Sequence, residues 1–331
     1  MSSPEPTHLQ ILRLLKEKDG YLSGTLLASQ LGLTRTGIWK QIQNLRSIGY
    51  EIESHPKEGY RLLATPDLLI PEEIVPHLTT SWLGKPYYYF PQIGSTNDEA
   101  LHLAAQGAPH GTVAVAEEQT QGRGRLKRPW LSAPRSGIYL SILLRTPLPV
   151  REASQSNLVA ALALVKTLRK EYDIPAAIKW PNDVLIHGKK TAGILTEMQS
   201  DQDYTRFLVV GIGMNVNYKK EQLEASFRYP GTSLAIERGR PIKRQELLLS
   251  FLQAFETEHD RFVKRGFESL VPALEQYSAI LGKAVKVHTA REEISGKVSG
   301  FNSDGALKLL TDAGKEEVIW VGDVMQVEGN Y

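Results

Sequence analysis

Strand-like runs joined by short turns fill the middle of the chain, and they limit the folds open to it more than any other feature. Six runs have the length and apolar content of strands, at 112–119, 137–145, 176–180, 183–186, 191–199 and 206–216. Several connections between them are far shorter than the crossover of about a dozen residues that parallel strands need. The sequence therefore predicts a mixed or antiparallel sheet in an α/β chain of the α+β type, with helices at 97–106, 152–172 and 244–264.

The overall composition excludes several classes of protein. The 331 residues allow two or three domains, and a net charge of +2 excludes a basic coat for nucleic acid spread over the whole surface. The sequence has no cysteine, which excludes disulfides and thiolate metal sites and favours a reducing cytoplasm. The N-terminus has no signal-peptide pattern, and the apolar run 158–165 is far shorter than the roughly 20 residues of a membrane span. We therefore expect a cytoplasmic protein with no membrane partner.

The first 65 residues have the pattern of a separate small unit. Leucines at helical spacing predict a helix near 7–18, and two further helices meet near Gly32. Ser23 and Thr34 are suited to cap those two helices. The segment 50–63 alternates, turns and alternates back, which predicts a hairpin. A helix-turn-helix followed by a hairpin is typical of the winged helix, whose second helix enters the major groove of DNA.

The second helix of this pair has an apolar face and a polar face. Ile38, Ile42 and Leu45 fall on one side, and the stretch 34–47 contains three basic residues and no acid. Threonine, glutamine and asparagine side chains are suited to base edges. We therefore expect this helix and the hairpin to contact DNA through Arg35, Thr36, Lys40, Gln43, Asn44 and Lys57. The alternative is an inert or protein-binding module whose polar face is simply solvated.

Two changes of pattern mark the other expected domain boundaries. Four prolines between 64 and 90 predict a linker and an entry segment, with no long helix. From residue 283 onward short alternating strands are separated by turns, which predicts a small β-barrel of the SH3-like kind. We therefore expect a winged-helix domain, a central mixed-sheet domain and a barrel at 1–65, 66–282 and 283–331.

One loop concentrates positive charge. In QTQGRGRLKRPW, residues 119–130, four basic side chains and two glycines occur with no acid among them: Arg123, Arg125, Lys127, Arg128, Gly122 and Gly124. Glycine permits close approach of the backbone, arginine offers a planar fork for phosphate oxygens, and Trp130 offers a face on which a base can stack. The loop is interpreted as a site for a phosphate compound, and the alternative is a solvated surface loop.

Three further motifs place polar groups near the ends of predicted elements. Asn182 and Asp183 follow a strand and a proline turn, and such a pair suits Mg²⁺, which needs few carboxylates when the substrate brings phosphates. Lys190 lies at the edge of an apolar strand, where its ammonium can face a cleft. Thr96 followed by Glu99 predicts a capping box at a helix start, which is also a place for an anionic group. The plainer interpretations are a turn, a surface lysine and a helix cap.

Other catalytic motifs are missing from the sequence. The segment GKKT at 188–191 has Asp183 where a Walker A loop requires glycine. The eight histidines show no zinc-ligand spacing, and no nucleophile elbow occurs. We therefore expect no zinc site.

Taken in order, the positive motifs resemble the bifunctional biotin–protein ligase and biotin-operon repressor family. The matching text is GSTN, Q-T-x-GRGR-x-x-R-x-W, KWPND, K-x-AGIL-x-E and GIGMNVN, between the winged helix and the barrel. The resemblance implies that ATP and biotin form biotinyl-5′-AMP and pyrophosphate, and that biotin then passes to a lysine of the biotin carboxyl carrier protein of acetyl-CoA carboxylase. It also implies that the adenylate-bound form dimerises, binds operator DNA and represses biotin-synthesis genes.

The resemblance also implies roles for residues of the matching motifs. The biotin site is expected to comprise Ser95, Thr96, Asn97, Gln119, Gly122, Arg123, Gly124, Arg125 and Lys190. ATP and the adenylate are expected to contact Arg125, Arg128, Trp130, Asn182 and Asn215. Joining two anions needs fixed cations and Mg²⁺ more than a general base, so the predicted catalytic set is Lys190, Arg123 and Asp183, with Asp183 holding the metal.

Three alternatives stay open at this point. They are a ligase whose winged helix no longer binds DNA, a ligand-sensing repressor with an inactive core, and a lipoate–protein ligase, a class that shares the catalytic fold. The acid-free helix argues against the first, and the retained charged residues Arg123, Arg125, Asp183 and Lys190 argue against the second. The GRGR loop favours biotin over lipoate. Lys127 departs from some family members, which have glycine there.

Overall fold

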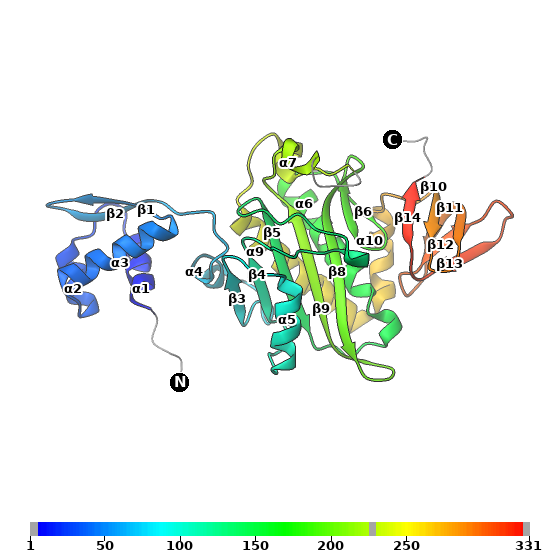
Figure 1. Cartoon of the computed structure of the whole chain (residues 1–331), viewed down its shortest axis with the longest axis horizontal. Helices are drawn as coiled ribbons and strands as arrows, with labels where there is room; N and C mark the ends of the chain where they lie inside the picture. Colours follow the sequence, from blue (N-terminus) through cyan, green and yellow to red (C-terminus); the bar gives the residue numbers. More distant parts are fainter. Residues whose placement is uncertain (1–5, 225–229, 327–331) are drawn as a thin grey trace. The chain divides into compact units, whose positions relative to one another are not determined.

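The computed structural model describes residues 6–224 and 230–326, and the chain divides into two compact units between Leu68 and Leu69. The first unit consists of three helices and a hairpin (Figure 1), namely α1 (Thr7–Glu17), α2 (Gly24–Leu31), α3 (Arg35–Ile48), β1 (Glu51–His55) and β2 (Gly59–Ala64). The two strands pair antiparallel. The predicted helix-turn-helix followed by a hairpin is confirmed.

Local sequence signals fix the ends of α2 and α3. Ser23 Oγ accepts a hydrogen bond from the backbone N–H of Thr25, and Thr34 Oγ1 accepts one from that of Gly37, at 3.2 and 3.0 Å. Gly32 ends α2 at φ +64°, a left-handed conformation that glycine adopts without steric cost. The core of the unit is formed by apolar side chains of all three helices: Ile11, Leu12, Leu15, Leu27, Ile38, Ile42 and Leu45.

A seven-stranded sheet forms the centre of the second unit. Its strands are β3 (Tyr87–Phe90), β4 (Val113–Ala116), β5 (Gly137–Leu144), β6 (Ala176–Lys179), β7 (Asp183–Ile186), β8 (Lys189–Ser200) and β9 (Thr205–Asn215). They lie in the order β3–β4–β5–β9–β8–β7–β6. The pair β3–β4 is parallel, and the other neighbouring pairs are antiparallel. The prediction of a mixed sheet is confirmed, and β3 is a strand that the sequence analysis missed.

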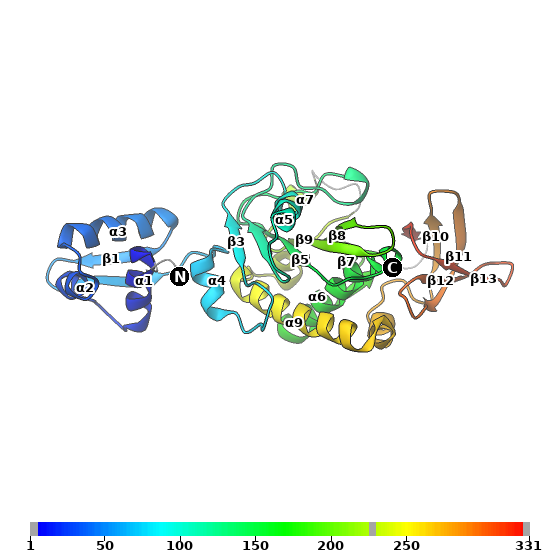
Figure 2. The ribbon, with the colours of Figure 1, turned by 90° about the horizontal axis from the view of Figure 1, so that it is seen from below.

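Helices cover the two faces of this sheet unequally. The long helices α6 (Gln155–Tyr172) and α9 (Arg244–Arg265) pack on one face and form the main core with it, whereas the shorter α5 (Thr96–Ala105) packs on the other (Figure 2). The apolar run 158–165 lies inside α6 and is buried along its whole length. Its hydrophobicity is therefore that of a core helix. None of the described helices is long and apolar enough to cross a membrane.

Short helical segments lie in several of the connections of the second unit. They are α4 (Pro71–Ile74), η1 (Val75–His77), η2 (Arg125–Lys127), η3 (Val150–Glu152), α7 (Lys220–Glu224), α8 (Leu234–Arg238), η4 (Phe267–Leu270) and α10 (Val271–Gln276). The proline-rich stretch after the first unit contains only such short pieces before β3, as its composition predicted.

The C-terminal part of the chain is a five-stranded antiparallel sheet. Its strands are β10 (Ala284–His288), β11 (Glu293–Phe301), β12 (Leu307–Leu310), β13 (Glu316–Ile319) and β14 (Asp323–Gln326). The order is β13–β12–β11–β10–β14, and β14 is a strand that the sequence analysis missed. The expected small all-β element is confirmed as this sheet, and its closure into an SH3-like barrel stays a prediction.

A tight turn docks the C-terminal sheet onto the central one. Gly305, at φ +80°, approaches so closely that an added Cβ would lie 2.5 Å from the ring of Phe267. The indole N–H of Trp180 donates to the Gly305 carbonyl at 3.1 Å, and Gln155 Nε2 donates to the carbonyl of Asp304 at 3.1 Å. These contacts hold the turn between β11 and β12 against α6, η4 and the end of β6.

Candidate active site

A cavity of about 520 Å³ opens over β8 and β9 in the second unit. Its walls come from the start of α5, the basic loop, the turn between β6 and β7, and the first residues of β14. Most of the residues predicted for ligand binding line this cavity, although they are far apart in the sequence: Ser95, Thr96, Asn97, Gln119, Arg123, Gly124, Arg125, Arg128, Trp130, Asn182, Asp183 and Lys190. The fold therefore brings the four sequence motifs to one place.

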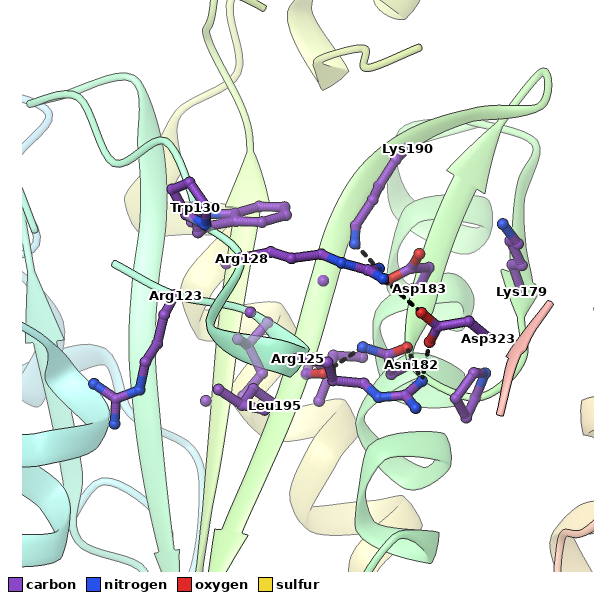
Figure 3. A pocket seen from close by; sticks show the side chains of 18 of the residues that line it. Arg123, Arg125, Arg128, Trp130, Lys179, Asn182, Asp183, Lys190, Leu195 and Asp323 are labelled. Atoms are coloured by element: carbon purple, nitrogen blue, oxygen red, sulfur yellow. Dashed lines mark hydrogen bonds and ion pairs between the residues drawn. The ribbon is translucent and has the colours of Figure 1, made fainter. Parts of the chain in front are cut away.

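Lys190 and Asp183 form an ion pair at one end of the cavity. Lys190 Nζ lies 2.6 Å from Asp183 Oδ1 and 5.3 Å from the centre of the Trp130 ring (Figure 3). Both side chains are mostly buried. The prediction that this ammonium faces a cleft is confirmed. Nearby Lys179 also lines the cavity, and burial lowers its pKa.

The basic loop is folded back on itself beside this ion pair. The backbone N–H of Gly124 donates to the carbonyl of Arg128 at 2.8 Å, and that of Trp130 donates to Gly122 at 2.9 Å. Leu126 and Lys127 have φ values of 55° and 56°, which are uncommon for residues with a side chain. The loop is thus a tight turn, and Gly122 lets its ends meet, because a Cβ added there would lie 2.8 Å from the Trp130 carbonyl oxygen.

Two arginines of the loop share one carboxylate from the C-terminal sheet. Arg125 Nη1 lies 3.1 Å from Asp323 Oδ1, and Arg128 Nη2 lies 2.8 Å from Asp323 Oδ2 (Figure 3). Arg125 also donates to the Gly322 carbonyl at 3.1 Å and to Asn182 Oδ1 at 3.4 Å. Asp323 was not predicted from the sequence, because nothing near it in the chain marks it as part of the site.

Glycines in β8 and β9 make room for the aromatic wall of the cavity. A Cβ added at Gly213 would lie 2.3 Å from Trp130 Nε1, and one added at Gly193 would lie 3.0 Å from the same ring. Since real Cβ atoms do not approach so closely, the indole can lie flat against the sheet only where these strands lack side chains. The glycines of the AGIL and GIGMN motifs, Gly193 and Gly213, are therefore explained in part by the space that the Trp130 indole needs.

The other end of the cavity is a polar network at the start of α5. Gln119 Oε1 accepts from the Thr96 backbone N–H at 2.8 Å, and Gln119 Nε2 donates to Ser132 Oγ at 3.0 Å. Ser95 is the N-cap residue and makes no capping hydrogen bond. The predicted capping box of Thr96 and Glu99 is therefore wrong, because the side chain of Gln119 satisfies the helix end instead.

Asn97 is held by hydrogen bonds to groups on two strands, β5 and β8. Its Nδ2 donates to Glu197 Oε2 at 2.7 Å and to the Leu195 carbonyl at 3.3 Å, and its Oδ1 lies 2.6 Å from Ser141 Oγ. A Cβ on Gly211 would lie 2.1 Å from Asn97 Oδ1, so this strand approaches the amide through a glycine. Ser141 and Glu197 were not predicted from the sequence.

Three predicted residues are placed differently from the rest. The guanidinium of Arg123 contacts Asp98 and Glu197 and points away from Lys190 (Figure 3). Gly122 is not among the lining residues, since Ser132 Oγ and the Trp130 carbonyl occupy the space beside it. Asn215 is fully buried and donates from Nδ2 to the Thr232 carbonyl at 3.1 Å, outside the lining of the cavity.

The residues predicted to contact DNA belong to the first unit. Arg35, Thr36, Lys40, Asn44 and Lys57 are exposed, and Gln43 is half-buried. Arg46 has a structural role, since it donates to the Ile52 carbonyl and to Ser54 Oγ in the hairpin. Trp39 is 52% exposed on the same helix and was not predicted. The polar face of α3 is thus open to a ligand.

The fold and cavity define a protein ligase of the biotin and lipoate class with an added helix-turn-helix unit. A family model described as the Biotin/lipoate A/B protein ligase family matches residues 89–215. Models described as an HTH domain and as the Biotin protein ligase C terminal domain match 7–61 and 280–325.

The chain belongs to the biotin–protein ligase family. It is 37% identical to the bifunctional ligase/repressor BirA of Bacillus subtilis over 298 residues, which covers 90% of this chain and 92% of the relative. It is 29% identical to the bifunctional ligase/repressor BirA of Escherichia coli, with 92% of each chain covered. Among solved structures, the biotin protein ligase of Aquifex aeolicus in complex with biotin and ATP aligns with a TM-score of 0.63 and 30% identity, covering 72% of this chain and 98% of that one.

Proposed function

We propose that this protein joins biotin to AMP in the cavity over β8 and β9 and then transfers biotin to a lysine of the biotin carboxyl carrier protein of acetyl-CoA carboxylase. One observation carries the proposal. The cavity has an excess of cations at one end, around Lys190 and Arg125. At the other end amide and hydroxyl groups surround Asn97 and Gln119, and the one cation there, Arg123, is paired with carboxylates. A ligand with a phosphate at one end and an uncharged ureido ring at the other matches this polarity.

The first step brings two anions together. A carboxylate oxygen of biotin bonds to the α-phosphorus of ATP, the bond from that phosphorus to the bridging oxygen breaks, and pyrophosphate leaves. The transition state carries more concentrated negative charge than the substrates, so fixed cations accelerate the step. We assign Lys190 to the biotin carboxylate and α-phosphate and Arg125 and Arg128 to the phosphates. Trp130 is assigned to the adenine.

Mg²⁺ fits the oxygen donors beside Lys190. Asp183 supplies a carboxylate and Asn182 an amide oxygen, and Mg²⁺ is commonly held by one or two carboxylates together with substrate phosphates. Among the described residues no group of three acidic or histidine side chains could hold a metal without a substrate. The ion would supply neutralisation of the phosphate charge, and Asp183 would orient Lys190 in either case.

In the second step the amine of the acceptor lysine attacks the biotinyl carbonyl, and AMP leaves with the electron pair of the broken C–O bond. The mixed anhydride hydrolyses readily in water, so the cavity has to exclude water until the acceptor arrives. The basic loop is suited to this role because it lies over the cavity and is closed by backbone contacts of Gly124 and Trp130.

The first unit supports a second part of the proposal. We propose that the adenylate-bound protein forms a homodimer, binds operator DNA through the exposed face of α3 and the hairpin, and represses biotin-synthesis genes. The exposed side chains of Arg35, Lys40 and Asn44 and the half-buried Gln43 are of the types that contact phosphates and base edges. We propose a cytoplasmic location, where both the acceptor protein and the DNA would be available.

The enzymatic proposal is tested by mixing the protein with ATP, Mg²⁺ and labelled biotin, with and without a biotin carrier domain. We expect labelled adenylate without the carrier and a labelled carrier lysine with it. Lys190→Met should slow adenylate formation by about 10²–10³-fold, the effect of removing one transition-state donor. Full activity of that variant would contradict the role of Lys190, and labelling with lipoate instead of biotin would contradict the substrate.

DNA binding is tested by gel shift with biotin-operator DNA at fixed salt, with and without biotin and ATP. Lys40→Ala should weaken binding and make it less sensitive to salt, because one phosphate contact is lost. Binding that is equal for Lys40→Ala and the parent protein would remove α3 from the interface. Mass measured by light scattering under the same conditions tests the dimer.

A further inference from the structure

Arg123 differs from the other arginines of the basic loop in the direction of its side chain. Arg125 and Arg128 reach Asp323, whereas the Arg123 guanidinium points away from them (Figure 3). Its Nη1 and Nη2 donate to the two carboxylate oxygens of Asp98 at 2.7 and 2.6 Å, which is the bidentate geometry that arginine favours. Nη2 also lies 3.1 Å from both carboxylate oxygens of Glu197.

The balance of charge around Arg123 does not favour a phosphate. One guanidinium faces two carboxylates here. At the other end the described part of the chain lines the cavity with two carboxylates, Asp183 and Asp323, and with four basic side chains: Lys179, Lys190, Arg125 and Arg128. The hydrogen bond to Asp98 raises the pKa of Arg123, and the same bond lowers the pKa of Asp98. A phosphate at Arg123 would have to displace a bidentate partner and then lie beside two negative charges. The phosphates are therefore better held at the Lys190 end.

Glu197 connects Arg123 to the buried amide of Asn97. An ionised carboxylate only accepts hydrogen bonds, so the atom 2.7 Å from Glu197 Oε2 has to be Nδ2 of Asn97. Oδ1 of Asn97 then faces Ser141 Oγ at 2.6 Å. Glu197, together with the Leu195 carbonyl that Nδ2 reaches at 3.3 Å, thus fixes which end of the amide points in each direction. Arg123 compensates the charge of Glu197 in a mostly buried place.

We propose that Arg123 is a positioning residue of the biotin site, and that it acts through Glu197 on Asn97 and through Asp98 on the first turn of α5. This proposal rests on the assignment of the biotin ring to the start of α5. It differs from a catalytic role at the phosphates, in which Arg123 would contact ATP directly. The other arginines of the loop can then exchange Asp323 for phosphates, while Arg123 holds the base of the loop to α5 and β8.

The test separates the two substrates. Adenylate formation is measured with biotin varied at saturating ATP, and with ATP varied at saturating biotin, for Arg123→Met, Arg123→Lys and Arg125→Met. Arg123→Met should raise KM for biotin by about tenfold, equivalent to roughly 1.4 kcal/mol, and leave KM for ATP within about twofold. Arg123→Lys should give a smaller rise, since it keeps the charge. Arg125→Met should raise KM for ATP instead.

Two further variants separate positioning from general damage. Arg206→Met removes an exposed arginine that pairs with Asp201 at 3.5 Å, and it should leave both KM values unchanged. The double variant Arg123→Met/Glu197→Met should be no worse for biotin than Arg123→Met, because both changes break the same connection. If Arg123→Met does not fold, Arg123→Lys and Asp98→Asn take its place in the same measurements.

The outcomes distinguish this inference from the proposed function. A rise in KM for ATP, a large fall in kcat at unchanged KM for biotin, or no effect at all in Arg123→Met would each overturn the positioning role. Binding of biotin alone is measured by calorimetry on the same proteins, and it should weaken by a similar factor in Arg123→Met. If the unmodified protein bound biotin but formed no adenylate, the proposed function would fail while the role of Arg123 stayed testable by calorimetry.

Discussion

At the scale of single residues, the shape of the cavity depends on positions that have no side chain. Gly213 and Gly193 leave space for the ring of Trp130, and Gly211 leaves space for the side-chain amide of Asn97. Charged residues supply the attraction for phosphates, but these three glycines determine where the indole and the amide lie. A methyl group in any of the three places would disturb ligand contacts before it disturbed the fold.

Gly213→Ala should weaken the binding of ATP. The new Cβ would lie 2.3 Å from Trp130 Nε1, so the indole has to leave its seat. We expect a rise of about tenfold or more in KM for ATP, the cost of one lost aromatic contact. Gly193→Ala, where the corresponding distance is 3.0 Å, should give a smaller rise. Equal effects of the two variants, or a rise in KM for biotin alone, would contradict the seat assigned to Trp130.

Much of the site could be predicted from residues whose type is unusual for their surroundings in the sequence. Lys190 in an apolar strand and the cations beside Gly124 stand out in the sequence, and both line the cavity. Asp323 does not stand out, and Glu197 is part of the K-x-AGIL-x-E motif but had no role assigned to it. Their roles depend on contacts with Arg128 and Arg123, which only the tertiary fold creates.

At the scale of elements, one buried ion pair ties the start of α9 to the central sheet and to the segment that enters it. Arg244 is fully buried and pairs with Glu117 Oε2 at 2.7 Å, directly after β4. Glu117 Oε1 accepts from the Leu69 backbone N–H at 2.8 Å, and the hydroxyl of Tyr87 donates to the Leu69 carbonyl at 2.6 Å. Both polar backbone groups of Leu69 are therefore held by side chains of the second unit.

Arg244→Met should destabilise the second unit strongly. The variant leaves Glu117 buried without this counter-ion, which typically costs about 3–5 kcal/mol. Urea unfolding followed by circular dichroism measures the loss. The control is Lys243→Met, which removes an exposed partner of Glu246 and should change the free energy of unfolding by less than about 1 kcal/mol. Similar values for the two variants would contradict the role given to the buried pair.

His259 on α9 should make stability depend on pH. Burial, together with nearby His110, lowers the pKa of His259 from its ordinary value to about 4. The unfolded chain then binds a proton between about pH 6.5 and 4 that the folded chain does not, so acid favours unfolding. Between pH 7 and 5 this group should remove roughly 2 kcal/mol of stability.

The measurement is urea unfolding at both pH values for the parent protein and His259→Phe. The variant should lose that share of the pH dependence, whereas replacement of the exposed His102 by glutamine should keep it. An unchanged slope in His259→Phe would show that other groups cause the acid sensitivity.

Long helices and strands were easier to predict than some of the short strands. Helices such as α6 and α9 have long periodic patterns, and strands such as β8 and β9 have long apolar runs, so both are recognisable. The strand β3 was missed because the prolines around it favoured a linker, although its sequence YYYF is rich in residues common in strands. The strand β14 was missed because its sequence DVMQ contains only two apolar residues. The wrong capping box at Thr96 has a different cause, since Gln119 satisfies that helix end from a distance in sequence.

At the scale of the whole molecule, the basic loop joins the central sheet to the C-terminal sheet through Asp323. Because Arg125 and Arg128 pair with Asp323, a ligand that attracts these arginines also changes a contact of β14. We expect residues 123–129 to be cut by protease more slowly once biotinyl-5′-AMP is bound. Mass spectrometry of a limited trypsin digest, with and without the adenylate, measures this, and equal cutting in both would contradict a loop that closes on the ligand.

The order of the helix-turn-helix unit, the mixed sheet and the small all-β sheet along the chain could be predicted from changes in pattern, and the location of the site between distant motifs could not. The resemblance supplied the roles, and the structure supplied the neighbours of each residue, such as the carboxylates around Arg123. For Arg123 and Asn215 the neighbours in the fold differ from the ligand contacts that the resemblance implies. Their neighbours in the fold give the more specific expectation of what each side chain does.

A crystal structure of this protein with biotinyl-5′-AMP tests the account most directly. We predict the ureido ring beside Asn97 and Gln119, the phosphate within hydrogen-bond distance of Lys190, and the adenine against Trp130. Arg125 should have exchanged Asp323 for the ligand, while Arg123 should still contact Asp98 and Glu197. A phosphate bound by Arg123, or an adenylate bound outside this cavity, would contradict the account.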